Sequence, residues 1–266
     1  MAKIPFSNLL HLNIPIALKV IRTVANWHIY SLDYLGLLPF KSVIYRLRNG
    51  LRFRLRPETS DRSTIDEVFV HGIYFRDETV IGENDIILDI GAHIGTFTAF
   101  ASKAAKNGQV YSFEPDEDNF RLLKENIELN DIRNACAINA AVSTENGRKS
   151  FFVTEYATSA HSIYRPHGRA REVIVDAVTL ADFVKSRGIK RIDLLKMDCE
   201  GSEYEIMLTC PKNVLEMVKR IAMECHNVPG HSADEIRVLL EENGFAVRSE
   251  DVPNIPDFRL LYAQRK

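Results

Sequence analysis

Apolar and polar positions between Asp85 and Pro115 fall into blocks that predict a strand, a turn, a helix and a second strand. The run 86–90 is β-branched and almost wholly apolar, which is typical of a parallel strand buried on both faces. Apolar residues then recur at helical spacing, namely Phe97, Phe100, Ala101 and Ala104. The run 109–113 predicts the second strand, and Glu114 stands at its carboxyl end, where open α/β sheets bind ligands.

The rest of the chain continues this alternation of strand-like and helix-like segments. Further strands are expected at 135–142, 191–197, 220–224, 245–248 and 258–263. Helical segments between them imply right-handed crossovers, so the pattern predicts an α/β fold with a doubly wound, mostly parallel sheet of seven strands. Residues at about 150–175 depart from the alternation and are expected to form an inserted hairpin or flap.

The N-terminal part has a different pattern. Residues up to about Phe40 look helical, and 42–56 alternates around Asn49-Gly50, a strong hairpin signal. We therefore expect residues 1–60 to form a helical extension and a small hairpin packed on a main domain of residues 61–266. The uncharged run 4–18 is shorter than the roughly 20 apolar residues of a spanning helix and lacks a cleavage site, which argues against a transmembrane segment or signal peptide. Peripheral contact of these helices with a membrane remains an alternative to packing.

The residues of the turn after the first strand limit which classes of ligand could bind there. A dinucleotide pattern G-x-G-x-x-G starting at Gly91 would need glycine where the chain has His93 and Thr96, which disfavours a nicotinamide-dependent oxidoreductase. No G-x-x-x-x-G-K-[ST] occurs either, which argues against a P-loop hydrolase. What remains is D-x-G-x-x-x-G, ending at Gly95, with Glu114 placed to bind ribose hydroxyls, so the pattern favours a nucleoside without a pyrophosphate.

This stretch resembles the cofactor site of class I S-adenosylmethionine-dependent methyltransferases, which have a Rossmann-like sheet. The segment 192–203, IDLLKMDCEGSE, resembles the signature of the FkbM branch, and the resemblance covers about residues 45–265. It implies that Glu114 accepts hydrogen bonds from the ribose and that small residues after the third strand make room for adenine. His93 departs from it, since the family more often has asparagine there; a histidine can still donate one hydrogen bond. The residues implied for cofactor binding are Asp89, Gly91, His93, Gly95, Glu114, Pro115, Asn139, Ala140 and Asp198.

Four polar residues at the carboxyl ends of two neighbouring strands are the candidate catalytic groups: Asp198, Glu200, Glu224 and His226. Transfer to a hydroxyl requires a group that takes its proton, and His226 titrates nearest neutrality. The carboxylates could instead bind a divalent cation that acidifies the hydroxyl, although spacing alone assigns no metal ligands. Acids before a helix start, such as Asp198 and Glu200, are also favoured by the helix dipole alone.

Composition adds limits on partners. A formal net charge of −2 gives no electrostatic case for nucleic-acid binding, and four cysteines without C-x-x-C are typical of a reduced, cytoplasmic protein. The sequence therefore predicts an S-adenosylmethionine-dependent methyltransferase (EC 2.1.1.-). The resemblance implies O-methylation of a hydroxyl-bearing acceptor such as a sugar, glycan or other polyhydroxylated small molecule. A non-catalytic nucleoside-binding or scaffold module is the alternative.

Overall fold

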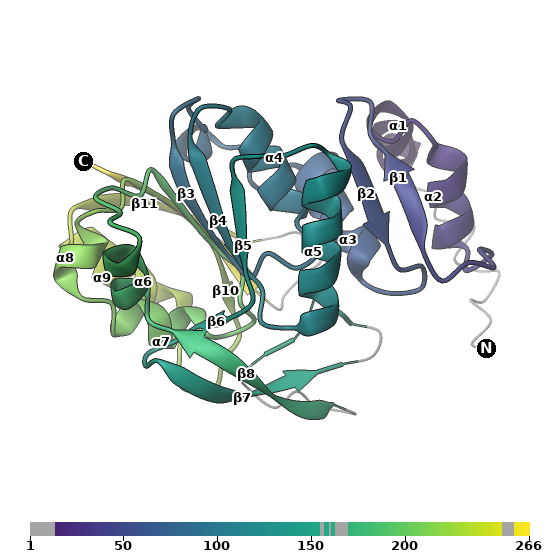
Figure 1. The fold of residues 1–266 in the computed structure, drawn as a ribbon. Helices are drawn as coiled ribbons and strands as arrows, with labels where there is room; N and C mark the ends of the chain where they lie inside the picture. The colour runs from purple at the N-terminus through teal and green to yellow at the C-terminus, as the bar shows by residue number, and fades with distance from the viewer. Residues whose placement is uncertain (1–13, 155–156, 160, 163–169, 252–257) are drawn as a thin grey trace.

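The computed structural model describes residues 14–154, 157–159, 161–162, 170–251 and 258–266. Its main sheet consists of β3 (Ile86–Ile90), β4 (Gln109–Phe113), β5 (Ala135–Ile138), β9 (Leu194–Met197), β10 (Arg220–His226), β11 (Phe245–Asp251) and β12 (Phe258–Arg265). The seven strands lie in the order β11-β12-β10-β9-β3-β4-β5 (Figure 1). All neighbours are parallel except around β12, which runs antiparallel to both β10 and β11. The predicted fold class is confirmed.

Helices cover both faces of this sheet. They are α4 (Thr96–Ala104), α5 (Glu117–Leu129), α6 (Leu180–Ser186), α7 (Glu203–Leu208), α8 (Lys212–Leu215) and α9 (Ala233–Glu242). Successive residues of β3 face opposite layers: Ile87 belongs to one buried apolar cluster, and Leu88 and Ile90 belong to another. Because both faces of β3 are buried, its sequence reads as a nearly continuous apolar run instead of an alternating one.

The N-terminal part forms a smaller layer at one end of the molecule (Figure 1). It contains α1 (Ile14–Thr23), α2 (Trp27–Tyr34), and a hairpin of β1 (Val43–Arg46) and β2 (Arg52–Leu55), followed by α3 (Asp61–Ile65), the π-helical turn η2 (Asp66–His71) and the 3-10 turn η3 (Asp77–Thr79). The hairpin is tied to α5 by Asn126, whose side chain accepts from Arg54 N and donates to Arg54 O. A shared apolar cluster then joins α1, α2 and the hairpin to α4 and α5.

The structure corrects the expected strand at 135–142. It stops at Ile138, and Ala141–Val142 form a separate strand, β6. β6 pairs in a second, three-stranded sheet with β8 (Arg171–Val178), which in turn pairs with β7 (Gly147–Val153). The chain therefore passes from the main sheet to the second sheet between Ile138 and Ala141. Among the described residues, no helix has the length and apolar character needed to cross a membrane.

Candidate active site

A cavity opens at the carboxyl ends of β3, β4 and β9. Its walls include seven of the residues expected from the sequence: Gly91, His93, Glu114, Pro115, Ala140, Asp198 and Glu200. Thr64 from α3 and Phe151 from β7 close other sides. Segments far apart in the sequence therefore meet around one cavity at the edge where open α/β sheets bind ligands.

The two glycines of the turn are required by the protein's own packing. Gly91 has φ of +77°, and a Cβ there would lie 1.7 Å from the carbonyl oxygen of Asp198. Gly95 has φ of +85°, and its Cβ would lie 2.6 Å from Leu123 Cδ1. Both conformations are left-handed and disfavour any residue with a side chain. In addition to leaving room for a ligand, Gly91 lets the ends of β3 and β9 approach each other closely.

Glu114 is buried at the cavity wall. Its Oε2 accepts from His93 N at 2.8 Å, and its Oε1 accepts from Asp116 N at 2.9 Å. Burial raises the pKa of this carboxyl to about 8, in spite of the two backbone donors. Each carboxylate oxygen can accept a further hydrogen bond, so Glu114 is held rigidly with capacity left for the hydroxyls of a ligand.

His93 sits between Glu114 and the N-terminal segment. Its Nε2 lies 3.3 Å from Asp61 Oδ1 and 3.2 Å from Thr158 Oγ1. Thr158 donates its own proton to Asp61, so the imidazole Nε2 is assigned as the protonated nitrogen. His93 Nδ1 is buried without a hydrogen-bond partner. In the neutral ring Nδ1 is an acceptor, so this histidine can donate one hydrogen bond through Nε2 and accept one at Nδ1.

Asp61, at the start of α3, is the carboxylate that orients the His93 ring through its contact with Nε2. Burial would raise its pKa, but hydrogen bonds from His93 and Arg56 hold the pKa of the Asp61 carboxyl well below its usual range. Arg56 Nη2 is 2.7 Å from Asp61 Oδ1. Thr59-Ser60-Asp61 therefore connects the N-terminal layer to the cavity wall.

Asp89 lies beneath the turn and is fully buried. Its Oδ2 accepts from Thr98 Oγ1 at 2.6 Å, and its Oδ1 is 3.3 Å from the ammonium of Lys196. Lys196 also donates to the carbonyl oxygen of Gly91 at 2.8 Å. The ion pair of Lys196 with the buried Asp89 therefore supports the glycine turn from below.

Asn139 holds the backbone of the cavity wall. Its amide donates to the carbonyl oxygens of Glu114 at 2.9 Å and Pro115 at 3.2 Å. The same amide nitrogen is therefore engaged by main-chain acceptors, while Ala140 lines the cavity directly.

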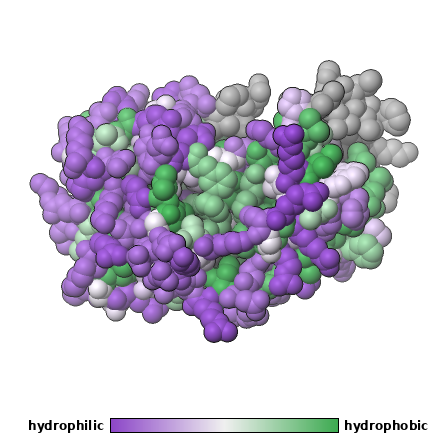
Figure 2. All heavy atoms as spheres, turned by 90° about the horizontal axis from the view of Figure 1, so that it is seen from above, coloured by the Kyte–Doolittle hydropathy of each residue, from purple (hydrophilic) through white to green (hydrophobic). Residues whose placement is uncertain are grey.

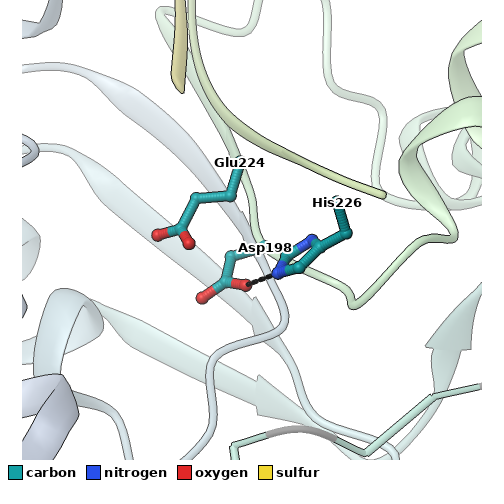
Figure 3. A group of neighbouring side chains, drawn as sticks. All are labelled: Asp198, Glu224 and His226. Atoms are coloured by element: carbon teal, nitrogen blue, oxygen red, sulfur yellow. Dashed lines mark ion pairs between the residues drawn. The ribbon is translucent and has the colours of Figure 1, made fainter. Parts of the chain in front are cut away.

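Three of the expected catalytic residues converge, as Figure 3 shows: Asp198 and His226 point toward one another, with Glu224 beside them. One ligand atom from each lies within 4.8 Å of the others. β10 runs to His226, two residues further than expected, and this places Glu224 and His226 on the same face of the strand. Glu200 joins the group, with Oε2 3.5 Å from His226 Nε2.

Glu203 organises this group and was not singled out by the sequence. It is fully buried, and its Oε2 accepts from Gly201 N at 2.7 Å. Its Oε1 accepts from Cys199 N at 2.8 Å and lies 3.0 Å from His226 Nδ1. Burial would raise its pKa, but His226 and the backbone donors keep the pKa of Glu203 below its usual value. An ionised Glu203 therefore accepts a hydrogen bond from the Nδ1–H group of His226, and Nε2 of the ring faces Asp198, 3.9 Å away.

The electrostatics of the group are dominated by negative charge. Burial alone would lower the pKa of His226, but the Glu203 carboxylate, with Glu200 and Asp198, raises it well above 6.5. Burial and Asp198 raise the pKa of Glu224 to about 8, and Tyr74 donates to Glu224 Oε1 at 2.6 Å. Such a group attracts a cation and can hold or accept a proton.

Sequence reasoning missed two features of this region. The Ser202 side chain makes no capping bond to α7, and Glu203 accepts from the preceding backbone instead. Tyr74 could not be recognised from the sequence, because 150 residues separate it from its partner Glu224. In the insert, His161 is buried beside Asp116, while Tyr164, Arg165 and His167, which could face an acceptor, lie outside the described residues.

The residues around the cavity fit a nucleoside cofactor that carries a positive charge. His93 Nδ1 is a buried acceptor without a partner, and Glu114 has free acceptor capacity nearby. Asp198 lines the same cavity and belongs to the carboxylate group described above. The acceptors around the cavity therefore match hydroxyls at one end and a cation at the other.

Comparisons with known proteins show which family this chain is similar to. A family described as "Methyltransferase FkbM domain" matches residues 89–247. The 31-O-demethyl-FK506 methyltransferase FkbM of Streptomyces tacrolimicus is 26% identical over 219 residues, which cover 70% of this chain and 82% of that protein. The hexuronic acid methyltransferase AglP of Haloferax volcanii is 26% identical over 160 residues, covering 60% and 63%. The solved structure of the Methanococcus jannaschii fibrillarin pre-rRNA processing protein has 15% identity and a TM-score of 0.49, covering 85% of this chain and 83% of that one.

Proposed function

Because the chain belongs to the FkbM family of S-adenosylmethionine-dependent methyltransferases, we propose that it methylates a hydroxyl group of a sugar, a glycan or another polyhydroxylated small molecule. Two relatives support this class of acceptor, since one is named for 31-O-demethyl-FK506 and the other for hexuronic acid. The observation that carries the proposal is the pair of His226 and Glu203. A buried carboxylate that orients a histidine is the arrangement of an assisted general base.

The cofactor would be held by the residues around the cavity. Glu114 would accept from the ribose hydroxyls, His93 Nδ1 would accept a further O–H or N–H, and Ala140 would leave room for the adenine. Asp198 would face the positive end of the molecule. When bound, the cofactor supplies a methyl group on a cationic sulfur, and the carboxylates beside Asp198 favour that charge.

The acceptor hydroxyl would lose its proton to Nε2 of His226. Glu203 keeps the Nδ1 proton in place and stabilises the imidazolium that forms. Asp198 and Glu200 lie on the Nε2 side and would accept hydrogen bonds from neighbouring hydroxyls of the acceptor. Placing the hydroxyl and the methyl group within reach of each other supplies much of the rate in such a displacement.

A direct assay tests the proposal. The protein is incubated with methyl-labelled S-adenosylmethionine and a panel of sugars, glycans and other polyols, and label is followed into the acceptor. His226→Asn should lower kcat by about 10²- to 10⁴-fold and leave affinity for S-adenosylhomocysteine unchanged. Tight S-adenosylhomocysteine binding without transfer to any acceptor would instead favour the scaffold alternative, and calorimetric binding of NAD alone would contradict both.

A second route rests on the same geometry. Asp198, Glu224 and His226 form a set that could hold a divalent cation, which would acidify the hydroxyl in place of a base. Lys196 Nζ lies 3.7 Å from Asp198 Oδ2, so a cation of the protein already adjoins this carboxylate. We therefore favour the base. Activity that disappears with EDTA and returns with Mg²⁺ or Mn²⁺ would establish the metal route.

A further inference from the structure

The exposed apolar residues of the protein are concentrated in one region. Of the 14 large apolar side chains exposed among the described residues, nine lie between positions 16 and 40. The most exposed are Phe40 at 62%, Leu37 at 61%, Tyr34 at 54%, Leu18 at 48% and Trp27 at 44%. We call the exposed side chains of residues 16–48 the N-terminal surface.

These exposed residues are not needed to fill the apolar core beneath α1 and α2. The inward sides of α1 and α2 are already packed, since Val20, Val24 and Tyr30 are buried in the cluster shared with the hairpin. Figure 1 places the two helices at the end of the molecule beyond β1 and β2. From above, Figure 2 shows hydrophobic residues reaching the surface in this right-hand part. The apolar side chains of the N-terminal surface therefore face outward from a layer that is complete without them.

The N-terminal surface is also positively charged. Residues 14–48 contain five basic residues, and all five are exposed: Lys19, Arg22, Lys41, Arg46 and Arg48. Their single acid, Asp33, is buried and accepts a hydrogen bond from Tyr45. The whole chain has a net charge of −2, so positive charge is gathered here against the overall balance. The segment that carries most of the exposed apolar side chains therefore also carries five exposed basic side chains.

We propose that the N-terminal surface docks on an anionic lipid bilayer. Apolar side chains would enter the boundary between head groups and acyl chains, and Trp27 and Tyr34 would lie at the level where such rings are enriched. The basic side chains would contact lipid phosphates, each with an attraction of about 1 kcal/mol near a charged membrane. A second copy of this chain fits less well, because a two-fold contact would bring the same positive charges together. Docking would bring the catalytic domain close to acceptors held at the membrane.

Trp27 makes this testable in the intact protein, because it is the only tryptophan in the chain. The protein is mixed with vesicles of phosphatidylcholine alone or with 30% phosphatidylserine, then sedimented. We expect co-sedimentation with the anionic vesicles, a blue shift of the Trp27 emission, and quenching by brominated lipids. Raising the salt concentration should weaken binding, because the charge contribution is screened.

Two double variants separate the two contributions. At about fivefold per charge removed, Lys19→Glu with Arg22→Glu should weaken binding to the anionic vesicles at least 25-fold. Leu37→Ser with Phe40→Ser should abolish the quenching by brominated lipids. Matched controls at other exposed sites, Lys185→Glu with Lys190→Glu and Val238→Ser, should change neither. Circular dichroism and thermal unfolding show that each variant is folded.

Three results would overturn the proposal. One is the absence of co-sedimentation with anionic vesicles; another is equal binding to both kinds of vesicle. The third is a stable dimer, by light scattering, that the Leu37 and Phe40 changes dissociate while vesicle binding is absent, since the surface would then join two copies.

Discussion

Replacing Glu203 by glutamine tests whether this residue sets the proton affinity of His226. The change keeps the shape of the side chain and removes its charge. A hydrogen bond to a charged group contributes about 1.5–3 kcal/mol, and 1.36 kcal/mol corresponds to one pKa unit, so the pKa of His226 should fall by about one to two units. One backbone donor, the N–H of Cys199 or Gly201, would also face the new amide group, which adds a cost in stability of about 1–3 kcal/mol.

The sign of the pH effect follows from the role of the histidine. A base must be unprotonated, so activity of the parent protein should rise with pH through the raised pKa of His226. In Glu203→Gln the rising limb of kcat/KM should move to lower pH by the same one to two units, and the plateau should fall because a weaker base remains. The ion pair stabilises the fold fully below pH 6.5, the ordinary pKa of histidine, and this contribution is lost as pH rises through the raised pKa.

The assay combines a pH profile of kcat/KM with an NMR titration of the His226 ring. Glu216→Gln, at an exposed position, is the matched control and should leave both curves in place. If Glu203→Gln moves the NMR titration while the limb of the activity profile stays where it was, then His226 is not the base. Glu224, whose pKa is raised to about 8, would be the next candidate.

Three other changes probe the support of the cavity. Gly91→Ala should cost about 1–3 kcal/mol more in unfolding free energy than Gly188→Ala, because both positions have positive φ but only at Gly91 would the Cβ overlap backbone atoms; thermal unfolding measures this difference. Glu114→Ala should lower affinity for S-adenosylhomocysteine by about 2–3 kcal/mol in calorimetry, and unchanged affinity would refute its assignment to the ribose. Lys196→Met leaves the buried Asp89 unpaired and should destabilise the fold by about 3–5 kcal/mol in denaturant titration, whereas the exposed Lys185→Met should be neutral.

Local patterns predicted the parts of the fold that depend on neighbouring residues. The buried strand at 86–90 and the hairpin at Asn49-Gly50 are both present. The third strand was predicted too long, because an apolar run does not show that the chain changes sheets between Ile138 and Ala141. Strand pairing of that kind is decided by distant partners, here β8.

The candidate site shows the same division. The carboxyl ends of parallel strands meet at one edge, so the convergence of Asp198, Glu224 and His226 could be expected from their places after or near strand ends. The sequence could not show which buried side chain orients His226 by a hydrogen bond. Glu203 looked like an ordinary residue of a helix start, and its contact with His226 exists only because α7 packs beside β10.

Part of the cavity wall and of the contacts around Glu224 comes from residues that precede the family match, which begins at position 89. Thr64 lines the cavity from α3, Asp61 pairs with His93 of the cavity wall, and Tyr74 donates a hydrogen bond to Glu224. A recombinant fragment that begins at residue 89 would lack one wall of the cavity. His93 would lose its contact with Asp61, and Glu224 would lose the hydrogen bond from Tyr74. Conversely, exchanging residues 56–80 between relatives offers a route to new acceptor preferences with the cofactor half of the protein left intact.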